Sequence, residues 1–347
     1  MNAAYLYSLI AVVVLGLIAY AGVEAAGLDG LFGVVIPYMA MLVFIVGFAN
    51  RMLDWAKSPV PFRIPTTSGQ QKSLPWIEHA KLDNPSTNRG VIGRMLLEVL
   101  VFRSLFKNNR VGFRPVGDSV RLSYKWVVWL WLFAIMFHYA FLVVLLRHLR
   151  FFLEPVPFFV SALERVDGML QLGLPGVFIS GGLLFGAASL LLLRRIVLPK
   201  LRYISLAADY FPLLLIIGIA ATGMMMRYYT KVDIVSIKEL TMGLATFHPT
   251  VPETGLSGLF FVHLFFVSIL IAYIPFSKLM HMGGVFLSPT RNLANNSRAK
   301  RHVNPWNYPV KTHTYEEYED DFREKMIEAG LPVEKEQKWQ ESPNQTN

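Results

Sequence analysis

The chain has 347 residues, of which 54% are hydrophobic and only 16% are charged. Soluble domains carry about 25% charged residues, so this composition excludes an ordinary soluble, disordered or fibrous protein. Cysteine is absent, which excludes disulfides, cysteine-based zinc sites and iron–sulfur clusters held by this chain. The formal net charge of +9 is concentrated in loops between apolar runs. That distribution is typical of membrane insertion, and we expect no nucleic-acid partner.

Six apolar runs approach or reach the length of a membrane-spanning helix, about 20 mostly apolar residues. Backbone groups in the hydrocarbon core must be satisfied within their own segment, so these runs are predicted to be helices. The predicted fold is an all-α integral membrane protein, a six-helix bundle with a cytoplasmic loop and tail. The first run has no Lys or Arg before it, which favours a retained helix over a signal peptide. The runs are Ala4–Val23, Leu31–Phe48, Trp126–Leu146, Pro175–Leu193, Tyr210–Met226 and Leu256–Leu279.

Positive charge is distributed unevenly among the segments that join these runs. Residues 51–125 carry 13 Lys or Arg against 5 Asp or Glu, and the turn Arg194–Arg202 carries four more basic residues. The loops on the other side carry no excess of basic residues. Basic loops stay on the cytoplasmic side of a bilayer. We therefore expect residues 51–125, 194–209 and 282–347 to face the cytoplasm, together with the N-terminus.

This orientation divides the chain into four predicted parts. Within the cytoplasmic loop, Gly90–Phe106 is apolar but interrupted by three charges, which favours an interfacial helix or a docking surface capped by Thr87 or Asn88. The tail is basic and then acidic, and we interpret it as an arm that wraps a partner. The parts are two N-terminal helices (1–50), the cytoplasmic loop (51–125), a four-helix core (126–284) and the cytoplasmic tail (285–347).

Four of the eight histidines lie in or at the ends of two predicted helices. His138 and His148 belong to the third helix, and His263 and His281 to the sixth. Ionisable residues inside a membrane are costly, so each is a candidate functional residue. Two histidines on each of two helices suit two bis-imidazole metal sites, and helical bundles commonly hold haem between facing side chains. Because the helices run in opposite directions, we expect His138 to pair with His281 on the inner side and His148 with His263 on the outer side.

The spacing of the histidines leaves the geometry imperfect. Ten residues separate His138 and His148 by about 15 Å and 80° on a helix, whereas eighteen residues are five full turns and place His263 and His281 on one face. Pro275 would kink the sixth helix; alternatively, His281 lies just past the helix end. The other histidines are interpreted as surface or loop residues: His79, His248, His302 and His313.

Three arginines are predicted at the outer ends of helices. Arg147, Arg150 and Arg227 are candidates to bind a haem propionate or a quinone oxygen, and interfacial snorkelling is an equally good reading. Asp209 is expected to be an acid at the N-terminus of the fifth helix. No general acid–base dyad is evident in the sequence.

The histidine spacing, together with the string Ile274–His281 (IPFSKLMH), resembles the di-haem cytochrome b gamma subunit of respiratory nitrate reductase. The resemblance covers about Leu31–Gly284, five of the six helices. It implies a five-helix core with one added N-terminal helix, two b haems ligated by the four histidines, and a menaquinone site near the outer haem. It also implies a cytoplasmic iron–sulfur partner.

Two further strings, Ser288–Leu293 and Arg301–Asn307, resemble the DsrM-type membrane subunit of the Dsr redox complex of sulfur-metabolising prokaryotes. This narrower resemblance implies the inner membrane of a prokaryote, a partner resembling heterodisulfide reductase, and a link to dissimilatory sulfite reduction. It leaves room for other membrane and periplasmic redox subunits. The longer segment before the third helix departs from the nitrate reductase pattern, and no quinone-site Lys or Gly can be matched.

The sequence thus favours an electron-transfer subunit of a quinone oxidoreductase complex, surrounded by membrane lipid. Electrons would pass between menaquinol or menaquinone and a cytoplasmic iron–sulfur subunit. Two alternatives remain open: a proton-coupled transporter that uses the four histidines as proton carriers, and a purely structural membrane anchor.

Overall fold

The computed structural model describes residues 3–58, 60, 63–64, 69–117, 119–168, 176–253, 255–297, 300, 309 and 311–334. Contacts divide the chain into two units, 1–301 and 302–347, which are described separately. The predicted helix start at Pro175, His302 and the string Arg301–Asn307 lie outside the described residues.

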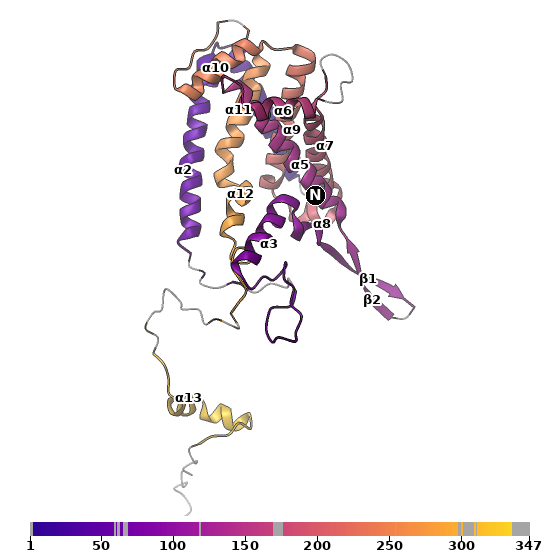
Figure 1. Cartoon of the computed structure of the whole chain (residues 1–347), viewed down its shortest axis with the longest axis vertical. Helices are drawn as coiled ribbons and strands as arrows, with labels where there is room; N and C mark the ends of the chain where they lie inside the picture. Colours follow the sequence, from indigo (N-terminus) through magenta and orange to yellow (C-terminus); the bar gives the residue numbers. More distant parts are fainter. Residues whose placement is uncertain are drawn as a thin grey trace, which may run out of the picture. The chain divides into compact units, whose positions relative to one another are not determined.

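In the described part of the chain, six helices are long and apolar enough to cross a membrane, which confirms the predicted all-α, multi-pass membrane bundle (Figure 1). Their ends differ from the prediction by several residues. The second helix, for instance, continues to Ala56 instead of ending at Phe48. The spans are α1 (Ala4–Glu24), α2 (Ile36–Ala56, preceded by a π-helical turn Leu31–Val35), α5 (Val128–His148), α7 (Ile179–Val197), α9 (Ala207–Met225, followed by a π-helical turn Met226–Thr230) and α11 (Gly258–Tyr273).

The first helix is packed into the bundle between α9 and α11. Ala19 is fully buried, and the Ser8 hydroxyl donates to the Ala207 carbonyl at 3.0 Å. At the other end of α1, the Glu24 carboxylate accepts a hydrogen bond from the Gly258 backbone N–H at 2.9 Å. These contacts tie both ends of α1 to later helices.

The last spanning helix ends earlier than predicted. Pro275 has no backbone N–H and restricts the residue before it, so α11 stops at Tyr273 and a 3₁₀ turn, Ile274–Phe276, follows. Ser277 is extended, and its hydroxyl accepts a hydrogen bond from the Leu279 backbone N–H at 3.1 Å.

The chain then restarts as a second 3₁₀ turn, Lys278–Met280, and the short helix α12 (His281–Gly284). The prediction that His263 and His281 share one face of a continuous five-turn helix is therefore wrong. The alternative, that His281 lies past the helix end, is confirmed. The break allows the position of His281 to be set independently of α11.

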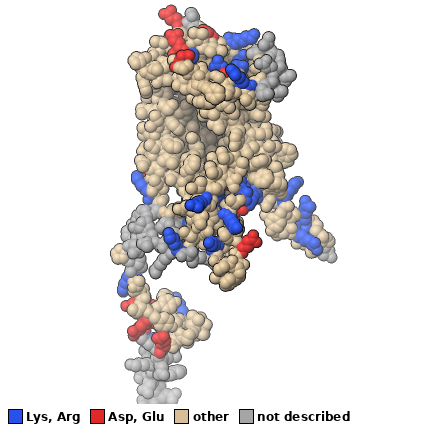
Figure 2. Space-filling model, viewed as in Figure 1, with Lys and Arg blue, Asp and Glu red and all other residues tan. Residues whose placement is uncertain are grey.

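The short elements lie at the two ends of the bundle (Figure 1). One end carries α3 (Asn88–Val101), α8 (Pro199–Ile204), α12 and a hairpin of β1 (Asn109–Val116) and β2 (Ser119–Trp126). The opposite end carries α6 (Phe158–Asp167) and α10 (Ile234–Thr246). Figure 2 shows charged side chains at both ends of an uncharged middle: mostly Lys and Arg at the end with α3 and the hairpin, and both signs at the opposite end. Within the first unit, α3, the hairpin, α8 and α12, which belong to segments predicted to be cytoplasmic, thus share one end (Figure 1).

The hairpin was not anticipated by the sequence interpretation. Its strands pair antiparallel, with Val111 opposite Tyr124 and Phe113 opposite Leu122. The signal was present: apolar and polar residues alternate on both sides of Gly117, which supplies the positive φ of +59° that the turn needs. Helices α6 and α10 were likewise read as loops.

Helix α3 is capped at its first turn, and the segment before it is held by a charged cluster. The Thr87 hydroxyl caps α3 by accepting from the Gly90 N–H at 3.3 Å, which confirms one of the two predicted caps. Asp83 accepts hydrogen bonds from Arg103, at 3.0 Å, and from Lys107. Partial burial raises the pKa of the Asp83 carboxyl, but these two cationic partners outweigh it and hold the pKa below its ordinary value.

We expect Asp83→Asn to loosen the segment Arg103–Lys107, because the substitution removes the charge that both cations bind. The lowered carboxyl pKa means that this stabilisation is present above the unfolded pKa of about 3.9 and is lost as the pH falls through the folded value. Hydrogen exchange of residues 103–107 should therefore be faster in the variant at neutral pH. The difference from the wild type should shrink on acidification; a difference that persists at low pH would contradict this assignment.

The second unit contains one described helix, α13 (Tyr315–Glu328). Its first turn is a capping box: the Glu317 N–H donates to the Thr314 hydroxyl at 3.2 Å, and the Thr314 N–H donates to the Glu317 carboxylate at 3.0 Å. The sequence analysis interprets this tail as an arm that wraps a partner and makes no prediction of a helix within it.

Candidate functional site: two histidine pairs

The structure brings the four membrane histidines together as two pairs. His138 of α5 and His281 of α12 have ring centres 5.9 Å apart, with ring planes at 81°. His148, the last residue of α5, and His263 of α11 have ring centres 6.4 Å apart, with planes at 15°. These are the pairs expected from helix direction. The first lies toward the end that carries α3 and the hairpin, and the second toward the end that carries α6 and α10.

Each imidazole is oriented by a hydrogen bond at Nδ1. The rings of His138 and His148 bond the carbonyls of Ala134 and Val144, one helical turn earlier, both at 2.7 Å. His281 bonds the Lys278 carbonyl at 2.9 Å. A carbonyl only accepts, so the proton of these three rings lies on Nδ1.

The fourth ring, His263, bonds the Thr222 hydroxyl at 2.9 Å. That hydroxyl has its own acceptor, the Gly218 carbonyl at 2.8 Å, so it is free to accept from the ring. All four histidines therefore present an unprotonated Nε2, the arrangement found where a second group fixes the tautomer of a metal-ligating histidine.

The spacing within each pair suits one metal ion between two rings. Metal–imidazole bonds of about 2.0–2.1 Å on opposite sides of an ion place the two ring centres about 6 Å apart. The two observed separations, 5.9 and 6.4 Å, bracket this value. Among the described residues, no group of three or more His, Asp or Glu side chains could hold a metal. Any metal between these rings would need its other ligands from beyond these described side chains, and a porphyrin supplies four nitrogens.

The exposure of the rings also suits a large apolar cofactor. His148 and His281 are exposed, although His148 lies within a membrane span. An uncovered imidazole in hydrocarbon is costly unless a partner covers it. A haem that binds Nε2 and covers the ring would remove this cost. The paired histidines therefore suit a haem.

Aromatic residues from the basic end close over the inner pair. The Phe102 ring meets His138 edge-on, with centres 4.9 Å apart, and Phe102 is held at a φ of +51° between α3 and α4 (Arg103–Phe106). Tyr139 of α5 donates to the Leu100 carbonyl at 2.8 Å, and Trp131 donates to the Val101 carbonyl at 2.8 Å. The C-terminal end of α3 is thus built directly onto the inner pair.

Asp209 fulfils the predicted role and a second one. It caps α9 by accepting from the Leu206 N–H at 3.0 Å. Its other oxygen binds the Lys278 ammonium at 2.6 Å, with Arg195 at 3.8 Å. The carbonyl of the same Lys278 orients His281. The ion pair between Lys278 and Asp209 therefore links the inner histidine pair to α9. The sequence interpretation did not assign a role to Lys278.

Two of the three predicted outer arginines are partnered by α6, a helix that the sequence interpretation missed. Arg147 binds Asp167 of α6 at 2.7 Å, and Arg150 binds Glu164 of α6 at 2.7 Å. Asp167 also accepts from the backbone N–H of Ser180, at 2.7 Å, and from its hydroxyl. The sequence analysis assigns no role to these carboxylates, because it treats the segment that forms α6 as a loop.

Arg147 and Arg227 lie against the ring of Phe178, with their guanidinium carbons 3.2 and 3.8 Å from its centre. The Nε atoms of both arginines are buried without a partner among the described residues. The outer end therefore holds two cationic groups with unused donors, as a site for a propionate or a quinone oxygen requires.

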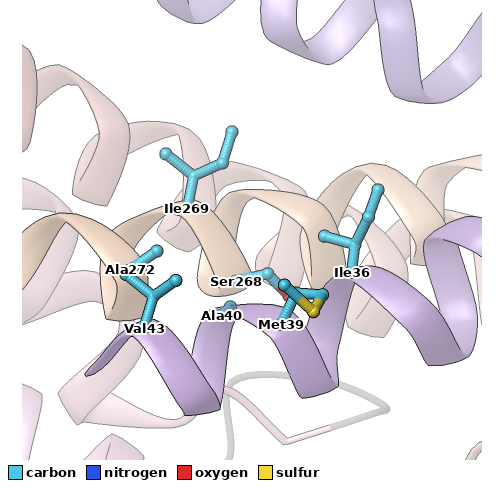
Figure 3. Close-up of a pocket in the computed structure, with 7 residues that line it drawn as sticks. All are labelled: Ile36, Met39, Ala40, Val43, Ser268, Ile269 and Ala272. Carbon is cyan, nitrogen blue, oxygen red and sulfur yellow. The ribbon is translucent and has the colours of Figure 1, made fainter. Parts of the chain in front are cut away.

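A shallow groove of about 210 Å³ lies between α2 and α11 (Figure 3). Its only hydroxyl, Ser268, already bonds the Leu264 carbonyl at 2.8 Å. The groove therefore offers apolar contacts, and its lining side chains have no hydrogen-bond donor left for a ligand. Its lining consists of Ile36, Met39, Ala40, Val43, Ser268, Ile269 and Ala272.

Comparison with known proteins identifies the family of this chain. Residues 94–299 match the family model of the nitrate reductase gamma subunit. The chain is 48% identical over 282 residues to the Hdr-like menaquinol oxidoreductase cytochrome b-like subunit of Archaeoglobus fulgidus, covering 80% of this chain and 83% of that protein. It is 44% identical over 277 residues to the protein of the same name in Archaeoglobus profundus, covering 78% and 81%. The chain therefore belongs to the nitrate reductase gamma subunit family, within the membrane cytochromes b.

Proposed function

We propose that this chain is the di-haem cytochrome b subunit of a menaquinol-linked redox complex. The observation that carries the proposal is the two pairs of adjacent imidazoles, with ring centres 5.9 and 6.4 Å apart and a hydrogen bond at Nδ1 of every ring. His138 and His281 would hold the inner haem b, and His148 and His263 the outer one. Bound b haems would carry single electrons across the bilayer.

The protein's own contribution is to fix these ligands. Backbone carbonyls orient three rings, and a threonine orients the fourth. Burial and hydrogen bonds to the ligands are among the ways in which a protein sets the potential of a haem. Direction of electron flow follows from the partners and not from this geometry.

For the quinone we propose the outer end. Arg147 and Arg227 offer buried Nε donors on either side of Phe178, and the relatives are named for menaquinol oxidation. A menaquinol oxygen or an outer haem propionate is the acceptor that these donors lack. The guanidinium of Arg150 is instead occupied by Glu164, so we give it a structural role.

For the partner we propose a cytoplasmic iron–sulfur subunit resembling heterodisulfide reductase, docked at the basic end. The relatives carry the name Hdr-like. Helix α3 exposes Ile92, Leu96 and Leu100 at helical spacing, and its C-terminal end contacts the inner pair through Phe102. The membrane would be the inner membrane of a prokaryote, with the C-terminus cytoplasmic and further redox subunits bound. The string Ser288–Leu293 supports a link to dissimilatory sulfite reduction.

The experiment that tests this function is a reduced-minus-oxidised visible spectrum of the purified chain. We expect b-type bands and about two haems per chain by the pyridine haemochrome assay, since each facing imidazole pair holds one iron. A colourless protein would reject the proposal and leave the two alternatives, a histidine-dependent proton-coupled transporter or a structural anchor. Proton uptake by reconstituted vesicles would then separate those two.

A further inference from the structure

We infer that Thr222 is a positioning residue for the outer haem site, and that through His263 it sets the reduction potential of that site. The inference rests on the proposed function, because it assigns His263 as a ligand. Its basis is the hydrogen-bond chain from the His263 ring to Thr222 Oγ1 and onward to the Gly218 carbonyl, at 2.9 and 2.8 Å.

His263 differs from the other three histidines in how it is held. His138 and His148 bond carbonyls four residues earlier on α5, and His281 bonds the carbonyl three residues before it. Each of those contacts is local. The partners of His263 come from a different helix, α9: the Thr222 hydroxyl, forty-one residues away along the chain, and the Ile219 carbonyl.

The backbone of α9 is shaped for this contact. A Cβ placed on Gly223 would lie 3.2 Å from Cε1 of His263, so glycine at this position lets the helix approach the ring. The Thr222 hydroxyl also lies 3.1 Å from the Ile219 carbonyl, which confines its proton to the α9 side. The lone pairs of the hydroxyl are left to accept the Nδ1 proton of His263.

This direction of donation has an electronic consequence. An acceptor at Nδ1 makes a ligating imidazole more basic and a stronger electron donor to the metal. A stronger donor stabilises the ferric state and lowers the reduction potential. Thr222 therefore holds the outer haem at a lower potential than the same site would have without the hydroxyl.

The test is a potentiometric titration of the two b haems in the full chain, with Thr222→Val, Thr222→Ser and the wild type. Valine keeps the volume and removes the acceptor, so the outer midpoint should shift upward while the inner midpoint stays. Serine restores the hydroxyl and should restore the wild-type value. The matched control is Thr246→Val, because the Thr246 hydroxyl makes the same kind of bond within its own helix, to the Met242 carbonyl at 2.9 Å. The hydrogen bonds found for Thr246 involve none of the four paired histidines.

Loss of one haem in Thr222→Val, with both retained in Thr222→Ser and Thr246→Val, would also support the inference. If Thr222→Val does not accumulate in membranes, Gly223→Ala provides a second route, since its Cβ would press on His263 and should move only the outer midpoint. Two unchanged midpoints in a variant with full haem content would overturn the inference and leave the proposed function intact. A wild-type chain without haem would instead reject the proposed function itself.

Discussion

Replacing His148 with alanine is expected to halve the haem content of the chain. His148 faces His263 at 6.4 Å, and the two rings have no third His, Asp or Glu beside them in the described residues to take over as ligand. An iron held by one axial imidazole is bound more weakly, and its low-spin b-type spectrum is lost. His138 of the inner pair lies in the middle of α5, about 15 Å along the helix from His148, so the inner pair should keep its haem.

The measurement is pyridine haemochrome quantitation beside the reduced spectrum of the same sample. His248→Ala is the matched control, because His248 is exposed and bonds only the Thr246 carbonyl among the partners found for it. Full haem content in His148→Ala and also in His263→Ala would show that the outer pair is not a ligand pair. Loss of both haems would show that the two sites do not fold independently.

The second large effect is expected at Asp167. Asp167→Ala removes the partner of Arg147 and leaves a guanidinium in a site where its side chain is only 14% exposed. Breaking a buried ion pair from one side costs about 3–5 kcal/mol, because the remaining charge is uncompensated. Both hydrogen bonds from Ser180 are lost at the same time. We expect a marked fall in the thermal unfolding temperature of the detergent-solubilised chain.

Glu164→Ala is the comparison for this experiment. It removes the neighbouring ion pair with Arg150, whose side chain is 36% exposed, and surface pairs of this kind are worth about 0–1 kcal/mol. Equal losses in the two variants would mean that burial does not distinguish the pairs. A smaller loss for Asp167→Ala than for Glu164→Ala would contradict the assigned role of Asp167.

The membrane architecture could be predicted from sequence because the bilayer imposes a simple rule. A span needs a long apolar run, and α1 to α11 contain six of them in the described residues. Helix direction then follows from the positions of Lys and Arg, and direction alone suggests which histidines meet. The juxtaposition of His138 with His281 needed no further information.

The supporting residues could not be predicted, because their contacts join segments far apart in the chain. Asp167 meets Arg147 only because α6 folds back over the end of α5, and a ten-residue helix among loops gives a weak signal. Thr222 reads as an ordinary core residue until α9 is placed beside α11. Likewise, Pro275 signals a break, but the sequence does not say where the chain goes afterward.

The different inclination of the rings in the two pairs has a consequence for magnetic resonance. Crossed imidazole planes, as at His138 and His281, leave two iron d orbitals nearly equal in energy, whereas parallel planes, as at His148 and His263, split them. The oxidised protein should then give two distinct low-spin electron paramagnetic resonance signals, one strongly anisotropic and one rhombic. The two ends of the molecule would be distinguishable in a single frozen sample, without any substitution.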